Sequence, residues 1–352
     1  MAVYKIFPEK DAFILSNYPA QNTGRDEVLE VSNINGINQL SSAAGDLPAV
    51  RRALVQFNTT DINNVVTNKI GDASFQSNLN LYLANAGNLP LDYNIEAYAV
   101  TQSWDMGTGR VSNSPKTTDG VSWSWRQESG SGAWATEGGD WLTTTSGSQT
   151  FTYTSNKDIS MDVTPIVQLW NSASIDNNGF IVKLDDNIEF SASYVETNFF
   201  SVDTHTIYPP ELEFKWDDST YSTTLSALTS SDFVLKVTNL KSEFEDTSVY
   251  KFKLKARDTY PTRAFQTSSV YLDAKALPTS SYWGLKDIKT GEMVVDFDTT
   301  YTKISADNDS NYFTVYMDGL QPERYYQVVV KTEVEGETLV IEDKTNYFKV
   351  VR

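Results

Sequence analysis

The chain has 352 residues, of which 40% are hydrophobic and 21% charged, so its length and composition fit a globular protein with two folded domains. Its formal net charge of −18 argues against nucleic acid as a partner, because phosphate contacts need clustered lysine and arginine. The absence of cysteine excludes disulfides, thiolate metal sites and cysteine nucleophiles.

Short apolar stretches recur through the first 200 or so residues, and Gly, Asn, Asp and Pro separate them. No long helical pattern comes between them, which favours a sandwich or barrel of antiparallel strands over alternating helices and strands. The high content of Tyr, Phe and Trp supports strands as well. The predicted strands include residues 28–31, 53–57, 79–83, 95–100 and 180–184.

One stretch predicts a short helix that packs against the sandwich. Asp162 or Thr164 can cap its start, and Pro165 suits the first helical position. Its apolar residues, spaced i, i+3 and i+4, are Ile166, Leu169 and Trp170.

A long segment, residues 107–147, is rich in Gly, Ser and Thr but contains four tryptophans. Tryptophan rings in such a segment have to be buried against something. Two interpretations are open: the rings fold the segment onto the sandwich, or some of them form an exposed platform for sugars or a partner protein. The candidate contact residues are Trp123, Trp125 and Trp134, and the fourth tryptophan is Trp141.

The remaining chain again alternates as strands, for example at residues 233–237, 250–255, 292–297 and 325–330. We place a domain boundary in the polar stretch 217–220. The predicted fold is therefore all-β, with a jelly-roll sandwich at 1–218 and an immunoglobulin- or fibronectin-like sandwich at 219–352. The segment 319–326 has a Leu, a Pro and a Tyr placed as at a tyrosine corner, where the hydroxyl bonds back to main chain. A hairpin at Glu335-Gly336 and a final strand should follow.

Several short motifs follow one another in the first part of the chain: Asp11-Ala12-Phe13-Ile14, Tyr18-Pro19, Asn22-Thr23-Gly24, an R-x-L-x-x-F pattern from Arg52 to Phe57, residues 79–83, Ser103-Trp104-Asp105, Asp162-Val163-Thr164 and Asn178-Gly179-Phe180. Their order resembles the DNRLRE-type jelly-roll family, which is related to carbohydrate-binding modules. The resemblance implies a binding or structural module, with carbohydrate as the default ligand. The Thr-Trp dipeptide expected after the Ser-Trp element is present only loosely, as Ser122-Trp123.

Three further segments, residues 4–11, 204–216 and 257–263, resemble virion proteins of T-even-like cyanophages and related marine phages. This resemblance covers essentially the whole chain. It implies a structural protein of the tail, neck, baseplate or capsid surface, in which other virion proteins are the partners and several copies form a symmetric assembly.

Few residues are available for catalysis or for holding a metal. The single histidine, His205, lies in a polar turn, where a surface or turn-stabilising role fits better than a catalytic triad. Glycoside hydrolysis needs only two carboxylates, but no pair among the 46 acids is marked out. Asp307-Asn308-Asp309 and Asp185-Asp186-Asn187 could hold a structural calcium, although both read more simply as turns. No other cofactor is expected.

Two clusters of basic residues stand out in the sequence. Arg51-Arg52 precedes an apolar strand, and one of the two could point outward while the other pairs with an acid. The alternating Lys251, Lys253 and Lys255 share one strand face. They could guard an edge strand against unwanted pairing or form a patch for acidic neighbours.

We therefore expect a non-enzymatic phage virion protein that acts by docking to other proteins. The alternative is a carbohydrate-binding adhesion protein that uses the loop tryptophans on a host-surface glycan, and a third hypothesis is a carbohydrate-active enzyme. No apolar run approaches the roughly 18 residues that span a bilayer, and the first residues lack the pattern of a secretory signal. The expected location is accordingly the virion, after synthesis in the host cytoplasm.

Overall fold

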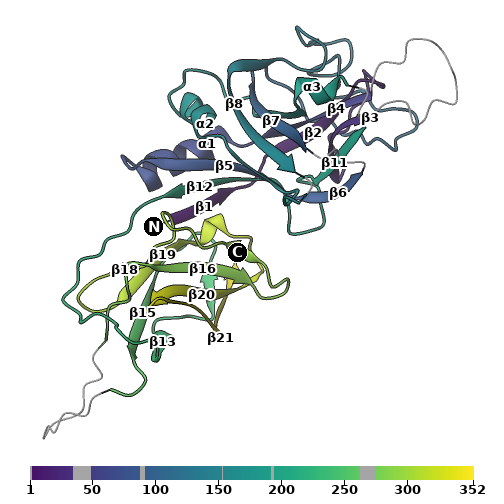
Figure 1. Cartoon of the computed structure of the whole chain (residues 1–352). Helices are drawn as coiled ribbons and strands as arrows, with labels where there is room; N and C mark the ends of the chain where they lie inside the picture. The colour runs from purple at the N-terminus through teal and green to yellow at the C-terminus, as the bar shows by residue number, and fades with distance from the viewer. Residues whose placement is uncertain (1, 35–48, 88–91, 153, 192–193, 262–273) are drawn as a thin grey trace, which may run out of the picture. The chain divides into compact units, whose positions relative to one another are not determined.

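The computed structural model describes residues 2–34, 49–87, 92–152, 154–191, 194–261 and 274–352 (Figure 1). Strands dominate it, and the prediction of an all-β fold is confirmed. Thr262 and Arg263, which end the third phage-like segment, lie outside the described residues.

The chain divides into two compact units. One unit contains residues 6–71 and 76–213, and we call it the N-terminal sandwich. The other, the C-terminal sandwich, contains residues 1–5, 72–75 and 214–352. The boundary at residue 218 stays a prediction about where independently folding domains meet.

The N-terminal sandwich is built around an eight-stranded sheet in the order β6-β11-β3-β4-β10-β7-β8, with β2 also paired to β4. A four-stranded sheet has the order β1-β12-β5-β9, in which residues 2–5 of β1, Phe75 of β5 and residues 214–216 of β12 belong to the C-terminal sandwich. The strands are β1 (Ala2–Ile6), β2 (Lys10–Leu15), β3 (Val28–Ile34), β4 (Ala49–Gln56), β5 (Phe75–Leu81), β6 (Leu83–Gly87), β7 (Asp92–Val100), β8 (Trp141–Thr152), β9 (Ile159–Asp162), β10 (Phe180–Leu184), β11 (Val195–Phe200) and β12 (Glu211–Trp216).

The helices of the N-terminal sandwich are short: α1 (Thr59–Asn64), a π-helix (Val65–Ile70), α2 (Thr164–Asn171) and α3 (Asp186–Glu189). Helix α2 confirms the predicted helix, and it packs through Ile166, Val167 and Trp170. The Trp170 ring lies 4.6 Å from that of Phe180 on β10. The predicted cap is wrong: Val163 is the N-cap residue and makes no side-chain cap bond, while Asp162, one position earlier, accepts a hydrogen bond from the backbone N–H of Thr164.

The C-terminal sandwich has two sheets, in the orders β13-β15-β19-β18 and β14-β21-β20-β16-β17. A 3₁₀ turn (Met317–Gly319) precedes β20. The strands are β13 (Phe233–Val237), β14 (Glu243–Glu245), β15 (Val249–Asp258), β16 (Ser281–Asp287), β17 (Met293–Val295), β18 (Ser305–Ala306), β19 (Asn311–Tyr316), β20 (Tyr325–Val334) and β21 (Glu337–Val351).

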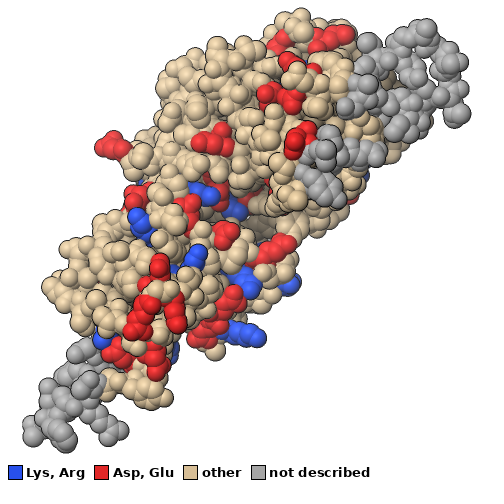
Figure 2. Space-filling view, viewed as in Figure 1, with Lys and Arg blue, Asp and Glu red and all other residues tan. Residues whose placement is uncertain are grey.

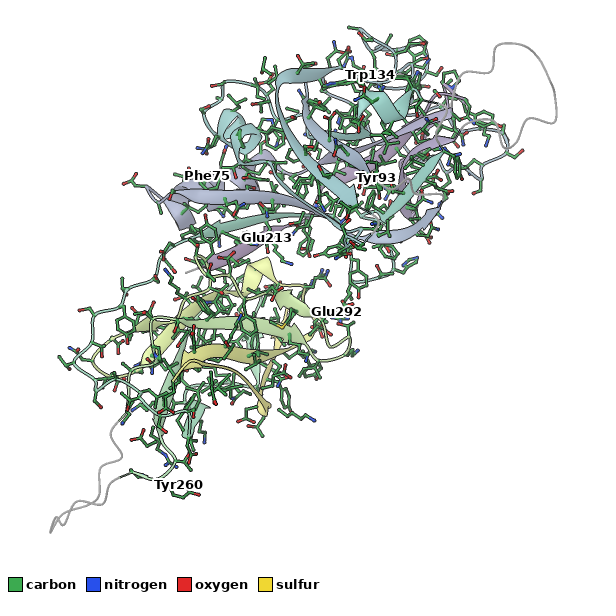
Figure 3. All side chains as sticks on the ribbon, in the orientation of Figure 1. Phe75, Tyr93, Trp134, Glu213, Tyr260 and Glu292 are labelled. Atoms are coloured by element: carbon green, nitrogen blue, oxygen red, sulfur yellow. The ribbon has the colours of Figure 1, made fainter. Side chains whose placement is uncertain are left out.

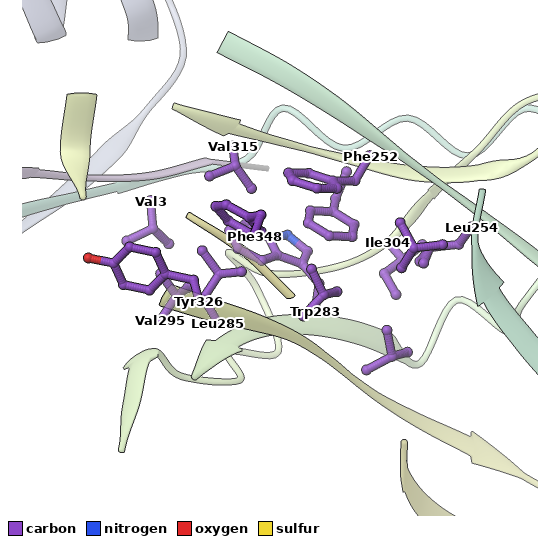
Figure 4. Close-up of a cluster of buried hydrophobic side chains, with 14 of the residues drawn as sticks. Val3, Phe252, Leu254, Trp283, Leu285, Val295, Ile304, Val315, Tyr326 and Phe348 are labelled. Carbon is purple, nitrogen blue, oxygen red and sulfur yellow. The ribbon is translucent and has the colours of Figure 1, made fainter. Parts of the chain in front are cut away.

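Aromatic rings fill the space between these two sheets (Figure 4). The Phe313 ring stacks on Trp283 at 4.8 Å and on Phe252 at 5.2 Å. Phe348 closes the cluster against Phe252 at 5.3 Å. Rings of this size bury enough apolar surface to hold a sandwich together without disulfides.

The predicted tyrosine corner and hairpin are both confirmed. The Tyr326 hydroxyl donates to the Gln321 carbonyl, 2.8 Å away and five residues upstream. Strands β20 and β21 pair antiparallel on either side of Glu335 and Gly336, whose φ angles are +55° and +79°. Two successive positive φ angles are typical of the hairpin turn that matches the strand twist.

Candidate functional site

The outer face of the eight-stranded sheet carries the most distinctive group of side chains. Side chains along a strand alternate between faces, and Ile181 of β10 pairs with Leu54 of β4 and with Tyr98 of β7. The residues two positions away, Lys183 and Arg52, therefore share this face with the apolar ones. The sheet thus has an apolar outer face that ends in two cations.

The segment 101–140, between β7 and β8, covers that face and creates a second apolar core. Its Trp104, Val121 and Trp134 are buried against Ile14 of β2 and Ile181 of β10. The first interpretation of the tryptophans, that they fold the segment onto the sandwich, is therefore confirmed at this core. Figure 3 labels Trp134 in its place on the N-terminal sandwich.

The Asn22-Thr23-Gly24 motif holds this segment in place. The Asn22 side-chain amide donates to the carbonyls of Met106 at 2.7 Å and Val121 at 2.9 Å. Its carbonyl accepts from the N–H of Gly109 at 2.7 Å. A Cβ atom at Gly120 would lie 2.7 Å from the Asn22 amide nitrogen, so the close approach requires glycine. The motif therefore has a structural role: its hydrogen bonds fix the segment in place.

A buried ion cluster lies beside the second core. Arg52 forms a two-point ion pair with Glu189 of α3, with Nε–Oε1 and Nη2–Oε2 distances of 2.8 and 2.7 Å. Its Nη1 donates to the Gly138 carbonyl at 2.7 Å. The Lys183 ammonium lies 3.5 Å from the same Glu189 carboxylate and donates to Asp186 at 2.7 Å. The side chains of Arg52, Lys183 and Glu189 are at most 4% exposed.

Two half-buried tryptophan rings lie against the cations, and the half-buried ring of Tyr98 packs against one of them. The Arg52 guanidinium lies 4.8 Å from the Trp123 ring centre and 5.0 Å from that of Trp141. The Trp141 ring is 6.1 Å from that of Tyr98. Burial raises the pKa of Tyr98 to about 12, and its hydroxyl donates to Glu96 at 2.8 Å. We call Arg52, Lys183, Glu189 and these three rings the aromatic–ionic cluster.

The geometry of the cluster indicates what it can do. Each nitrogen of the Arg52 guanidinium donates a hydrogen bond, so this charge is held rigidly and fixes the rings that pack on it. The rings of Trp123, Trp141 and Tyr98 are only partly covered, so each keeps some surface exposed. A fixed, partly exposed aromatic surface next to polar groups suits a ligand with an apolar face and polar edges.

The three tryptophans predicted as contact residues lie in different surroundings. Trp134 is 5% exposed, and its indole N–H donates to the Ser122 carbonyl at 2.9 Å. A ring enclosed in a core has no free face, so the expectation of a ligand contact is wrong for Trp134. Trp123 belongs to the aromatic–ionic cluster. Trp125 is half-buried, close to its bridge with Ala133, and its role stays a prediction.

Sequence reasoning missed Tyr98, Trp141, Lys183 and Glu189 as members of one cluster. The alternation of Glu96 and Tyr98 with Ala97 and Ala99 on β7 could have marked an outward aromatic. Nothing in the sequence indicates that α3 brings Glu189 to Arg52, because the two are 137 residues apart. Of the two neighbouring arginines, Arg51 also forms an ion pair, with Glu30, so the expectation that one would simply point outward is wrong.

In the C-terminal sandwich, the acidic turn considered for calcium lies next to the three alternating lysines. Asp307 lies 3.5 Å from Lys251, and Asp309 lies 3.1 Å from Lys253 and 3.8 Å from Lys255. These lysines therefore already neutralise the carboxylates. Strand β15 lies between β13 and β19, so the edge-guard hypothesis is wrong, whereas the acidic neighbours exist. Within the described residues, no group of three or more His, Asp or Glu side chains could hold a metal ion.

His205 is a surface residue, with its side chain 89% exposed and Nε2 at 4.0 Å from Glu27. The second acidic turn has a structural role, because Asp185 caps α3 by accepting from the N–H groups of Asn187 and Ile188. In the ranges that the structure covers, no helix is long and apolar enough to cross a membrane.

The first part of the chain matches a protein-family model. Residues 2–136 match the model of carbohydrate-binding module family 96. This range includes Arg52, Tyr98 and Trp123 but ends before Trp141 and Lys183. The match supports a domain like a carbohydrate-binding module in this part of the chain, in agreement with the resemblance to DNRLRE-type jelly rolls. Such modules bind and do not catalyse.

Solved structures give only distant likenesses. They include β-glucuronidase 3 of Bacteroides uniformis (TM-score 0.19, 11% identity) and a β-glucuronidase of Parabacteroides merdae (0.18, 10%). A DUF4785-family protein of Legionella pneumophila has a TM-score of 0.16 and 8% identity. The alignments cover 98–99% of this chain but only 35%, 36% and 65% of those chains. At these TM-scores the likeness carries no inference. Curated proteins give no match.

Proposed function

We propose that this protein is a non-catalytic carbohydrate-binding protein and that its N-terminal sandwich binds glycans at the aromatic–ionic cluster. The observation that carries the proposal is the match of residues 2–136 to carbohydrate-binding module family 96. The cluster supports it, because two half-buried tryptophan rings lie on the Arg52 guanidinium and a third half-buried ring, Tyr98, packs against Trp141. A sugar ring can stack its C–H face on such rings while its hydroxyls bond to neighbouring polar groups.

Two tryptophan variants test the site. We expect Trp123→Ala and Trp141→Ala each to weaken glycan binding about tenfold, the equivalent of one lost stacking contact. A glycan array followed by calorimetry on the best ligand gives the measurement, and urea unfolding shows whether each variant is folded.

Trp125→Ala is the matched control, because Trp125 lies on the same segment but outside the aromatic–ionic cluster. Loss of binding at Trp125 alone would move the site to the loop surface. A flat array for the folded wild-type chain would contradict glycan binding altogether.

Docking to virion proteins is the second candidate function, and it rests on the sequence resemblance to phage proteins. It is compatible with glycan binding, since a virion protein can also recognise a host-surface glycan. Mass spectrometry of purified phage particles tests it, and absence of the chain from the particles would contradict both the virion location and the partners inferred from it.

A further inference from the structure

An open groove of about 460 Å³ lies in the C-terminal sandwich, apart from the aromatic–ionic cluster. Two tyrosines, Tyr221 and Tyr282, and one cation, Lys303, line it. Ile304 also borders the groove but is buried in the core, and the remaining lining side chains carry hydroxyls: Ser219, Thr279 and Ser280. The volume falls within the range of roughly 300 to 1,000 Å³ that is common for small-ligand sites.

Backbone hydrogen bonds hold the walls of the groove. The segment around Tyr221 is tied to β18, where Ser222 donates to the Ala306 carbonyl at 3.0 Å and Ala306 donates back to Thr220 at 3.0 Å. On the other side, Tyr282 of β16 is bridged to Lys303. Ile304 donates to the Ser281 carbonyl at 2.8 Å. The backbone segments that carry the lining residues are therefore positioned before any ligand arrives.

Tyr221 is exposed and yet fixed. Its side chain is 43% exposed, although its hydroxyl donates to the Leu277 carbonyl at 2.6 Å. The hydroxyl is thus used inside the protein, and the ring is what the residue presents to solvent. Burial raises the pKa of this hydroxyl, which keeps it protonated and able to donate. An exposed ring held at its far end is suited to stacking, because little side-chain freedom is lost on binding.

The lining chemistry selects a class of ligand. Tyrosine rings accept the C–H face of a sugar, and hydroxyl and ammonium groups bond to its polar edge. None of the groove-lining residues is acidic, which disfavours a cationic ligand. We propose that this groove is a second saccharide-binding site, with the sugar ring stacked on Tyr221 and its hydroxyls or a carboxylate directed to Lys303 and the neighbouring Ser and Thr side chains. This site is independent of the one in the N-terminal sandwich.

The test is calorimetry of the full chain with four oligosaccharides: cellohexaose, laminarihexaose, mannohexaose and hexagalacturonate. We expect Tyr221→Ala to weaken binding of at least one of them about tenfold, the equivalent of one lost stacking contact. Tyr221→Phe keeps the ring and should stay within about threefold of the wild type, since it loses only the bond to Leu277. Lys303→Gln, a second surface variant, should weaken hexagalacturonate more than the neutral sugars.

Trp141→Ala separates this proposal from the proposed function. If binding is lost with Trp141→Ala and unchanged with Tyr221→Ala and Lys303→Gln, the groove proposal is overturned and the N-terminal site stands. Loss with Tyr221→Ala alone supports the groove and counts against the N-terminal site. Two sites of different affinity, each removed by its own variant, support both. Absence of binding for all four oligosaccharides overturns the groove proposal.

Discussion

The outer sheet faces of the two sandwiches both carry ion pairs, which are buried in one and exposed in the other. In the N-terminal sandwich, segment 101–140 covers the face, and Arg52, Lys183 and Glu189 are buried beneath it. In the C-terminal sandwich, Lys253 and Asp309 remain 41% and 62% exposed. On the side shown in Figure 2, acidic and basic side chains lie side by side over the C-terminal sandwich.

The difference in burial decides how much each ion pair contributes to stability. A buried ion that loses its partner has no water to replace it, whereas an exposed pair exchanges its contact for hydration at little cost. The buried cluster can therefore fix neighbouring rings, and the exposed lysines can only adjust the surface charge. The two kinds of ion pair should therefore respond very differently to the loss of one partner.

Removing the shared anion should be the most damaging change. Glu189→Gln leaves the Arg52 guanidinium and the Lys183 ammonium buried together without the carboxylate between them. We expect a loss of about 3 to 5 kcal/mol in the free energy of unfolding, because a buried charge without its partner is strongly destabilising. Urea unfolding of the full chain, followed by tryptophan fluorescence, measures it. A loss below about 1 kcal/mol would show that the cluster behaves like a surface pair.

A buried acid, Asp11, predicts a pH dependence. Asp11 is 1% exposed, and its Oδ2 accepts from the N–H of Val202 at 2.6 Å. Burial raises the pKa of Asp11 to about 7; the hydrogen bond from Val202 opposes the rise, the charge of Asp203 adds to it, and the charge of Arg25 opposes it. The folded state holds this proton more tightly than the unfolded state does. The contribution of protonated Asp11 to the free energy of unfolding is therefore complete below pH about 4 and is lost as the pH rises to about 7.

The Asp11→Asn variant isolates this effect. The wild-type stability, relative to that of the variant, should fall by up to about 1.4 kcal/mol per pH unit between pH 4 and 7 and then stay level. Urea unfolding at a series of pH values gives the two curves. Parallel curves would mean that Asp11 ionises in the folded protein much as it does in water.

The sequence was informative wherever local chemistry decides the structure. Pro165 and the apolar spacing after it located α2, and the segment 319–326 located the corner made by Tyr326. Alternation predicted most strands, because it reflects burial on one face. The aromatic–ionic cluster could not be predicted in this way. It depends on segment 101–140 closing over a sheet and on Glu189 meeting Arg52 from a distant helix, and both are consequences of the tertiary fold.

Gly138 tests whether the covering segment must sit tightly on the cluster. Its φ is +91°, and a Cβ would lie 2.5 Å from Arg52 Nη1 and 2.8 Å from the Trp123 ring. Gly130, on the same segment, has φ +89° with nothing within 4 Å of its Cβ position. Both Ala variants bear the strain of a positive φ, about 1 to 2 kcal/mol, but only Gly138→Ala adds a collision, worth roughly 1 to 3 kcal/mol more. Equal losses in urea unfolding would contradict tight packing at the cluster.

The smallest effect should come from the exposed pairs of the C-terminal sandwich. Asp309→Asn removes the partner of Lys253 and Lys255 but leaves both ammonium groups in water. We expect a loss under about 1 kcal/mol at low salt, and less at high salt, where exposed charges are screened. Urea unfolding at two salt concentrations measures it, with Glu189→Gln as the reference. A large, salt-independent loss at Asp309 would erase the contrast between the two faces, because it would mean that this pair also depends on exclusion of water.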